Sequence, residues 1–271
     1  MTFPPIAFLG AGQMAEALIR GVLKAELVRP GDVVATDIRP ERPEYLAREL
    51  GIQTAPNSAA ALGYGRLAVV AVKPQDVGGL LAEVSPLLGS DHVLVSIAAG
   101  VTLARLEQGL RPGTRVVRVM PNTPALIGAG MAAVSPGHHA GPEDGELVRQ
   151  MMSAVGQAVM LPEYQLDAVT ALSASGPAFV AIFVEGLIDA GVRVGLPRDV
   201  ATLLTLQTVL GTTRMIQETE RHPAVMKEMV TSPGGTTIAG VHALERGGMR
   251  AALIDAIVAA TERSKELGKE A

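Results

Sequence analysis

The chain has 271 residues, a formal net charge of −4, 48% hydrophobic residues and only 3% aromatic residues. This length exceeds one small domain and is sufficient for two, each with a core of its own. The sequence contains no cysteine, which excludes disulfides, thiolate catalysis and cysteine-based metal sites. The acidic balance and the scarcity of aromatic side chains argue against a nucleic-acid partner.

Charged residues interrupt the apolar stretches of the chain. The most apolar run, residues 177–188, contains Glu185, and we expect every such run to fall short of the roughly 18 residues that a membrane span requires. Residues 1–9 lack the basic region of a signal peptide. We therefore expect a cytoplasmic protein without a membrane partner. The five histidines are scattered, so no metal site is expected.

Short apolar runs alternate with helix-like stretches through the first 160 residues. Residues 13–24 are a predicted helix because Met14, Leu18 and Val22 recur on one face. Such continuous apolar runs are typical of a parallel sheet covered on both faces, so we predict an α/β fold with a Rossmann-type doubly wound sheet. The predicted strands are residues 6–9, 33–36, 67–72, 93–97, 116–119 and 131–134.

The pattern changes to helical spacing after Leu161-Pro162-Glu163. We predict a dinucleotide-binding domain over residues 1–162 and an all-α substrate and dimerisation domain over residues 163–271. Charges are so sparse between residues 165 and 213 that the helices there must be buried nearly all round. Two arrangements would bury them: a homo-oligomer built through this half, or neighbouring helices of the same subunit.

A glycine-rich motif directly follows the first predicted strand. Gly10-Ala11-Gly12-Gln13-Met14-Ala15 has the form G-x-G-x-x-A and opens the first predicted helix. Gly10 permits the tight turn, Gly12 lets the backbone approach a pyrophosphate, and Ala15 lets the helix pack closely on the strand. The helix start offers N–H groups and a positive dipole end to phosphates. The strand–turn–helix context favours a dinucleotide site over a turn without a ligand.

The end of the second predicted strand bears on the choice of coenzyme. Asp37 stands where a carboxylate would accept the ribose hydroxyls of NAD, although a turn or cap role is an alternative. Arg39 and Arg42 follow closely, and either could pair with the 2′-phosphate of NADP. The sequence therefore leaves both coenzymes open.

Two later strand ends are expected on the same edge of the sheet. Residues 71–75 place Lys73 where it could steer a phosphate, or where it is simply a solvated lysine before a proline-started helix. Ala98, Ala99 and Gly100 are small enough to let a nicotinamide ring lie close to the backbone, and packing alone would also explain them.

Two segments of the second half are too rich in hydroxyl groups and glycine for a plain helical core. One is residues 172–179, and the other is residues 229–240, in which four hydroxyl residues surround a Pro-Gly-Gly turn. Exposed N–H groups at a helix start, together with hydroxyls, form a seat for a carboxylate. A structural alternative, compatible with the first, makes Ser232 the helix cap and Pro233 the first helical residue.

With these motifs the chain resembles the pyrroline-5-carboxylate reductases nearly end to end. Residues 230–240 match the signature region of that family, which is far more specific than the glycine-rich fingerprint alone. The other matching segments are residues 10–15, 71–75, 118–124 and 175–178, and Leu244-Glu245 follow the signature region.

The resemblance implies NAD(P)H-dependent reduction of the C=N bond of 1-pyrroline-5-carboxylate to L-proline, the final step of proline biosynthesis. It implies that Thr237, the catalytic residue, lies beside the ring nitrogen, that Ser232 and backbone N–H groups hold the substrate carboxylate, and that Glu220 borders the site. The implied substrate-binding residues are Glu220, Val230, Ser232, Gly234, Gly235, Thr236 and Thr237. The expected coenzyme-binding residues are Gly10, Gly12, Gln13, Met14, Asp37, Arg39, Asn57, Ala71, Val72, Lys73, Pro74, Ala98 and Ala99.

The resemblance also implies an assembly, in which a homodimer completes the substrate loop and dimers form a larger ring, a decamer.

At the coenzyme end the chain departs from many members of the family. Residues 37–40 read Asp-Ile-Arg-Pro where those members have a turn containing serine or arginine. NADP and NAD both remain candidate coenzymes.

Two other functions compete with this interpretation. A hydroxyacid dehydrogenase with the same layout would need a lysine or histidine base. The second half offers Lys227, Lys265, Lys269, His222 and His242, and Lys227, near residues 229–240, is the one that merits mutation. A non-catalytic dinucleotide sensor would keep Gly10 and Gly12 but would not need the hydroxyl groups of residues 232–237.

Overall fold

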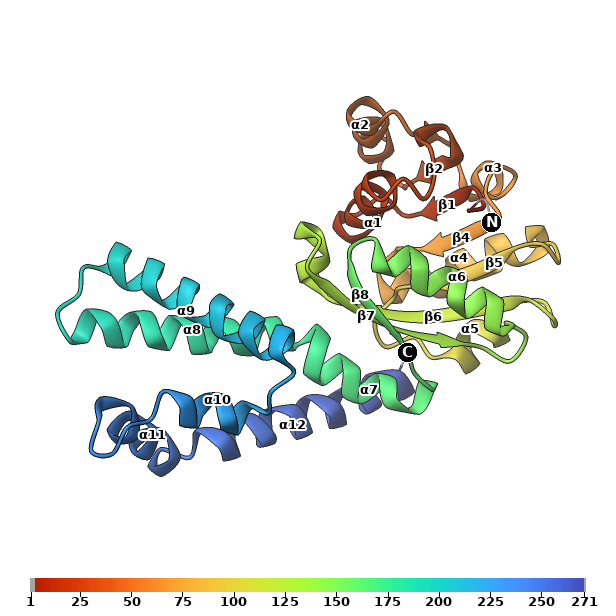
Figure 1. Ribbon diagram of the computed structural model, residues 1–271. Helices are drawn as coiled ribbons and strands as arrows, with labels where there is room; N and C mark the ends of the chain where they lie inside the picture. The colour runs from red at the N-terminus through yellow and green to blue at the C-terminus, as the bar shows by residue number, and fades with distance from the viewer. Residues whose placement is uncertain (1–2, 271) are drawn as a thin grey trace. The chain divides into compact units, whose positions relative to one another are not determined.

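An eight-stranded sheet organises the first part of the chain (Figure 1). In the computed structural model, which describes residues 3–270, the strands follow the order β3-β2-β1-β4-β5-β6-β7-β8. Pairing is parallel except between β6 and β7. The strands are β1 (Ile6–Leu9), β2 (Val33–Thr36), β3 (Gln53–Thr54), β4 (Leu67–Val70), β5 (Val93–Ser96), β6 (Arg115–Pro121), β7 (Gly130–Pro136) and β8 (Gly156–Met160).

The strand order reverses at β1, and the strands around this switch point end level with one another. Leu9, the last residue of β1, pairs with Thr36 of β2 and with Val70 of β4. The loops that leave β1, β2 and β4 therefore begin at the same edge of the sheet. In doubly wound sheets ligands bind in the crevice at this position.

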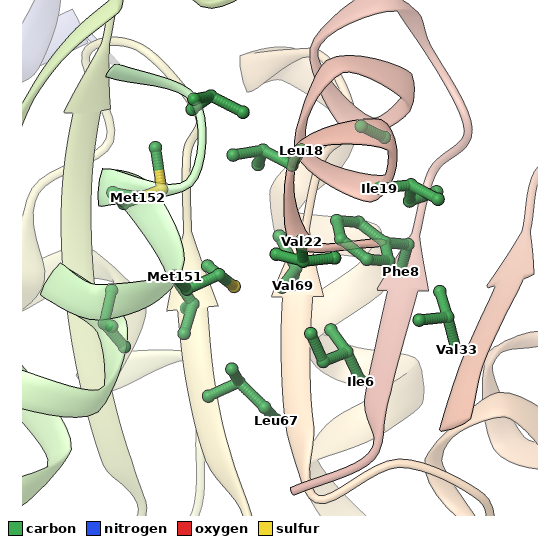
Figure 2. Packing of buried hydrophobic residues seen from close by; sticks show 14 of the residues in the cluster. Ile6, Phe8, Leu18, Ile19, Val22, Val33, Leu67, Val69, Met151 and Met152 are labelled. Atoms are coloured by element: carbon green, nitrogen blue, oxygen red, sulfur yellow. The ribbon is translucent and has the colours of Figure 1, made fainter. Parts of the chain in front are cut away.

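Side chains of each central strand alternate between two hydrophobic clusters, one on each face of the sheet. Ile6 and Phe8 of β1 point to the face covered by α1, α2 and α6, while Ala7 and Leu9 point to the opposite face, covered by α3, α4 and α5. Figure 2 shows Leu18, Ile19 and Val22 of α1 over Phe8, with Met151 of α6 beside them. These helices are α1 (Gln13–Lys24), α2 (Glu41–Leu50), α3 (Ser58–Leu62), α4 (Pro74–Val84), α5 (Leu103–Gln108) and α6 (Pro142–Ser153).

The predicted α/β class and the doubly wound sheet are confirmed, with one difference in strand direction. Pairing between β6 and β7 is antiparallel because residues 122–129 connect them, and a parallel crossover needs a dozen residues or more. Two strands, β3 and β8, are additional to the prediction. Both lie at edges of the sheet, and exposed residues interrupt each of them.

By its contacts the chain divides into two compact units, residues 1–175 with 260–271, and residues 176–259. After β8 the described residues form helices only. The second unit contains helices from α8 to the first part of α12. These helices are α8 (Gly176–Arg193), α9 (Arg198–Thr219), α10 (Pro223–Met229), α11 (Thr236–Arg246) and α12 (Met249–Glu270), whereas α7 (Leu166–Val169) belongs to the first unit. The predicted boundary after Pro162 remains a prediction.

The apolar helices of the second unit are not buried within the chain. None of the residues of α8 is buried, and in α9 the only buried residues are Ala201 and Thr205. Ile182 is 68% exposed and Leu203 is 71% exposed. Helices with so much exposed apolar surface need a further partner to cover them. Burial by neighbouring helices of the same subunit, one of the two predicted arrangements, is therefore not found.

One helical stretch of the described residues, Glu163–Arg193, is long and apolar enough, by length and composition, to cross a membrane. The expectation that charges interrupt every apolar run well before the length of a span was wrong, because residues 168–184 are 17 successive residues without Asp, Glu, Lys or Arg. An apolar helix that packs against other helices has the same composition. This finding alone is therefore weak evidence for a membrane span.

Candidate coenzyme and substrate sites

A cavity of about 870 Å³ lies where β1, β2 and β4 end. This volume is typical of a site for a small molecule or cofactor. Eight of the predicted coenzyme residues line it: Gly10, Gly12, Asp37, Arg39, Asn57, Ala71, Val72 and Lys73. Ten lining residues were not among the predicted coenzyme residues, although Gln75 lies in the predicted segment 71–75: Leu9, Thr36, Ile38, Pro56, Ser58, Gln75, Asp76, Gly79, Leu80 and Glu83.

Glycine is needed at the two glycine positions of the fingerprint for different structural reasons. Gly10 has a φ of +107°, and a Cβ there would lie 2.7 Å from the carbonyl oxygen of Ala71. Gly10 is therefore required by the fold. A Cβ on Gly12 would meet no protein atom within 4 Å, although Gly12 lines the cavity. The space beside Gly12 is thus left for a ligand that approaches the backbone closely.

The start of α1 faces the same cavity. Gly12 is the N-cap residue, and the first turn of a helix has N–H groups without intrahelical acceptors. Ala15 is fully buried against the sheet, as the third position of the fingerprint requires. Of the other predicted residues in this turn, Gln13 is exposed, Met14 packs against the core, and neither lines the cavity.

Asp37 follows β2, and both of its carboxylate oxygens accept backbone hydrogen bonds. The Ala11 N–H donates to Oδ2 at 2.8 Å, and the Arg39 N–H donates to Oδ1 at 3.0 Å. Arg39 Nε lies 3.6 Å from the same Oδ1. The carboxylate is thus fixed between the glycine-rich turn and the turn after β2.

Arg42 does not line the cavity. Its Nε donates to the Ala11 carbonyl at 3.0 Å, and its Nη2 donates to Glu16 Oε2 at 2.9 Å. Burial raises the pKa of Glu16, but hydrogen bonds from Arg42 and Arg20 outweigh this effect, and the pKa is lowered overall. The charge of Arg42 is therefore already paired beneath the glycine-rich turn.

Residues of the neighbouring strand ends fall into two groups. Lys73 is the N-cap of α4 and lines the cavity, whereas Pro74, the first residue of that helix, does not. After β5, Ala98 is buried and Ala99 is exposed, and neither lines the cavity. A nicotinamide position next to Ala98 and Ala99 stays a prediction.

The predicted substrate segment lies between α10 and α11 in the helical unit. The Gly235 N–H donates to the Ser232 carbonyl at 3.1 Å, and Gly234 has a φ of +67°. Proline and glycine at the two central positions with this bond define a type II turn. Helix α11 begins at Thr236 with Gly235 as its N-cap, so the alternative in which Ser232 caps the helix and Pro233 begins it was wrong.

The Ser232 hydroxyl nevertheless lies at the start of α11, since a Cβ on Gly235 would collide with its Oγ. Ser232 and Thr236 are exposed and Thr237 is half-buried. Because Gly235 has no side chain, α11 begins without a side-chain cap. Its free N–H groups and the hydroxyl together form a seat for an anion.

Two other predicted residues flank this turn in the sequence. Val230, the C-cap of α10, is exposed. Glu220 is exposed at the C-cap of α9 with a φ of +53°, an uncommon conformation for a residue other than glycine. Both side chains are exposed to solvent.

The other hydroxyl-rich segment, residues 172–179, runs from the first unit into the second, and its two serines, Ser173 and Ser175, lie in the first. Thr170–Ala174 forms a π-helical turn, in which the Ser175 N–H donates to the Thr170 carbonyl at 2.9 Å. Asn122, at the end of β6, holds this turn through hydrogen bonds to the backbone and the hydroxyl of Ser173. Such turns are frequent at functional sites. This contact explains part of the matching segment at residues 118–124.

Comparison with known proteins agrees with both halves of the chain. The family model for pyrroline-5-carboxylate reductase dimerisation matches residues 163–267, and a model described as NADP oxidoreductase coenzyme F420-dependent matches residues 5–100. A pyrroline-5-carboxylate reductase of Methanosarcina acetivorans is 44% identical, with 98% of each chain covered.

Solved structures give the same result. The pyrroline-5-carboxylate reductase of Coxiella burnetii has a TM-score of 0.93 at 33% identity and 98% coverage of each chain. A pyrroline carboxylate reductase of Plasmodium falciparum, solved with NADP bound, has a TM-score of 0.86 at 30% identity and 99% coverage of each chain.

The Rossmann-type sheet and the cavity at its switch point define the class of the protein, which is an NAD(P)-dependent oxidoreductase. The second half is a dimerisation domain, which accounts for the exposed apolar surface of α8 and α9. The chain belongs to the pyrroline-5-carboxylate reductase family.

Proposed function

We propose that the protein reduces 1-pyrroline-5-carboxylate to L-proline with NADH or NADPH. The observation that carries this proposal is the combination of the open cradle beside Gly12 with the hydroxyl-lined turn at the start of α11. Membership of the family supports the substrate assignment. The glycine-rich fingerprint alone would support only a nucleotide.

The coenzyme half of the proposal assigns roles to residues around the cavity. The backbone at Gly12 and the start of α1 would hold the pyrophosphate. Asp37 and Arg39 would contact the adenosine ribose, and Lys73 would contact phosphate or close the nicotinamide end. When bound, the reduced nicotinamide supplies the hydride.

The substrate half of the proposal places the ring carboxylate on α11. The Ser232 hydroxyl and the N–H groups at Gly235 and Thr236 form the seat, and the positive end of the helix dipole favours the anion. Val230 and Glu220 would border the ring. Thr237 would place its hydroxyl beside the ring nitrogen.

The proton requirement of the reaction is modest. Hydride adds to the carbon of the C=N bond, and the electron pair of that bond moves to nitrogen. An iminium substrate already carries the proton, so the protein mainly aligns the reactants and excludes water. For a neutral imine, Thr237 would relay a proton from water to the nitrogen.

We also propose that a homodimer completes the active site and that dimers assemble into a decamer. The exposed apolar faces of α8 and α9 support an extensive subunit interface. The proposal includes a cytoplasmic location, where nicotinamide coenzymes are available to the enzyme.

Steady-state oxidation of NADH and NADPH tests the proposal. With 1-pyrroline-5-carboxylate we expect oxidation of the reduced coenzyme. With hydroxyacids as substrates we expect no reduction of NAD+ or NADP+. The reverse pattern would identify a hydroxyacid dehydrogenase, for which Lys227→Ala would abolish activity. Coenzyme binding without turnover of any cyclic imine would identify a sensor.

Thr237→Val tests the proton step, because valine keeps the shape of threonine and removes its hydroxyl. We expect kcat to fall by about 100-fold. The matched control is Thr213→Val, since the Thr213 hydroxyl donates only to its own helix, at 2.6 Å from the Val209 carbonyl oxygen. Unchanged turnover in Thr237→Val would remove Thr237 from the proton step.

A further inference from the structure

The charged side chains that line the cavity are not those expected of a site for a coenzyme with an additional phosphate group. Its lining contains three carboxylates and two cations, so the lining carries net negative charge. The two cations are Arg39 and Lys73, and the carboxylates are Asp37, Asp76 and Glu83. NADPH differs from NADH only by a 2′-phosphate on the adenosine ribose, which such a lining disfavours.

Asp37 stands at the position that decides between the two coenzymes. It follows β2, the strand next to the glycine-rich turn, where a carboxylate accepts hydrogen bonds from ribose hydroxyls. Its side chain is only 10% exposed, and the Ala11 and Arg39 N–H groups hold both oxygens. Moving the carboxylate aside to admit a phosphate would break both hydrogen bonds.

The fixed carboxylate can still bind a ribose. An ionised carboxylate has about four acceptor sites. The Ala11 and Arg39 N–H groups occupy one on each oxygen, at 2.8 and 3.0 Å. The remaining sites can accept the hydroxyl hydrogens of an unphosphorylated ribose, whereas a phosphate has no hydrogen to donate when fully ionised.

The nearby arginines do not offset this repulsion. Arg42 is bound to the Ala11 carbonyl and to Glu16, and it does not line the cavity. Arg39 is 61% exposed, and its Nε lies 3.6 Å from Asp37 Oδ1. The Arg39 guanidinium is thus a solvent-exposed partner of the carboxylate that a phosphate would face, and part of its charge is offset there.

We propose that this chain uses NADH in preference to NADPH and that Asp37 determines the preference by accepting the ribose hydroxyls and repelling a 2′-phosphate. The inference rests on the proposed function only in so far as the cavity binds a nicotinamide coenzyme. It concerns binding, so it can be tested without the imine substrate.

Isothermal titration calorimetry of the full chain with NADH and with NADPH tests the preference directly. We expect the Kd for NADH to be at least tenfold lower than that for NADPH. In Asp37→Ser the ratio should shift toward NADPH by at least tenfold, with weaker NADH binding and tighter NADPH binding. The ratio of kcat/KM values for the two coenzymes should shift in the same direction.

Two variants serve as controls. Glu41→Gln removes an exposed carboxylate from the first turn of α2 that does not line the cavity, so the Kd ratio should stay unchanged. Arg39→Ala should leave NADH the tighter ligand.

Three results would overturn the inference: wild-type protein that binds NADPH as tightly as NADH, an Asp37→Ser variant with an unchanged ratio, or an equal shift in Glu41→Gln. A wild-type protein that binds neither coenzyme would instead refute the proposed function. Thermal unfolding of Asp37→Ser in the absence of coenzyme verifies that it is folded, and Asp37→Asn, which keeps one acceptor oxygen, provides a second variant if it is not.

Discussion

Both compact units of the chain contain strongly apolar elements, central strands in the first and long helices in the second, but cover them differently. In the first unit every residue of β1, β2, β4 and β5 is buried between two layers of helices. In the second unit no residue of α8 is buried, although α8 is rich in large apolar side chains. The first unit therefore carries its own core, whereas the second requires a partner subunit.

This difference teaches that apolar content alone does not identify a core. Phe8 and Phe183 are the same residue type in regular secondary structure, yet Phe8 is fully buried and Phe183 is exposed. Burial in the first unit is intramolecular and independent of concentration. The apolar surface of the second unit belongs to a dimerisation domain, and burial between subunits obeys mass action.

The largest effect should follow from truncating the core side chain. Phe8→Ala removes a fully buried ring beneath α1 and should lower the free energy of unfolding by about 3–5 kcal/mol. Phe183→Ala should instead give a change in Tm that grows on dilution. Thermal unfolding at several protein concentrations measures both.

If Phe8→Ala does not fold, Phe8→Leu allows the same comparison. This milder change should lower the free energy of unfolding by less than about 1.5 kcal/mol. A change in Tm for Phe183→Ala that is independent of concentration would show that its ring is buried within one subunit.

The second prediction separates assembly from coenzyme binding. The double variant Ile182→Glu/Leu203→Glu replaces the most exposed large apolar side chain of α8 and of α9 with a charge and should weaken subunit association by at least about 100-fold. Turnover should be lost with the assembly, while coenzyme affinity should remain because the cavity lies in the first unit. Light scattering and calorimetry measure the two effects.

Leu87→Glu is the matched control, since Leu87 is an exposed leucine of the first unit. It should leave the oligomer intact. A double variant that keeps the wild-type mass in solution would place the subunit interface elsewhere.

The third prediction distinguishes the two glycines within the first unit. Gly10→Ala should cost about 1–3 kcal/mol of stability, because its φ is +107° and a Cβ would meet the Ala71 carbonyl. Gly12→Val should leave stability nearly unchanged and raise the Kd for coenzyme by about tenfold, equivalent to 1.4 kcal/mol. Equal losses of stability in both variants would contradict the open cradle beside Gly12.

The smallest effect concerns pH. The pKa of Glu16 is lowered from 4.5, since the hydrogen bonds from Arg42 and Arg20 outweigh burial. A carboxyl group whose pKa is lowered on folding stabilises the folded state at pH values above its unfolded pKa. That stability is lost as the pH falls through the folded pKa. Glu16→Gln should therefore cost less than about 1 kcal/mol at neutral pH, and the difference from wild type should vanish in acid.

The sequence predicted the central strands because they are buried on both faces. The residue runs 6–9 and 33–36 agree with β1 and β2, since an uninterrupted apolar run is required there. The two residues of β3 are polar and exposed, and in β8 the apolar Val159 and Met160 are exposed at the sheet edge. Local pattern therefore could not predict the edges.

The candidate site was predictable where residues follow strand ends. Gly10, Asp37 and Lys73 were found because parallel strands bring their ends to one edge. Gly79 and Glu83 of α4 reach the cavity only through the packing of that helix, and no motif marks them. Ile38, which is 96% exposed, also lines the cavity. In the sequence it is only a large apolar residue between Asp37 and Arg39, and nothing there assigns it to the site.

Helix α12 begins in the second unit and ends in the first. Ser264, near its end, is buried and donates to Asp167 Oδ1 at 2.7 Å. During synthesis on the ribosome, the nucleotide-binding unit must therefore wait for the whole helical unit to emerge before residues 260–270 can complete it. A nascent chain halted before residue 260 would hold the glycine-rich turn and the sheet but lack this last segment.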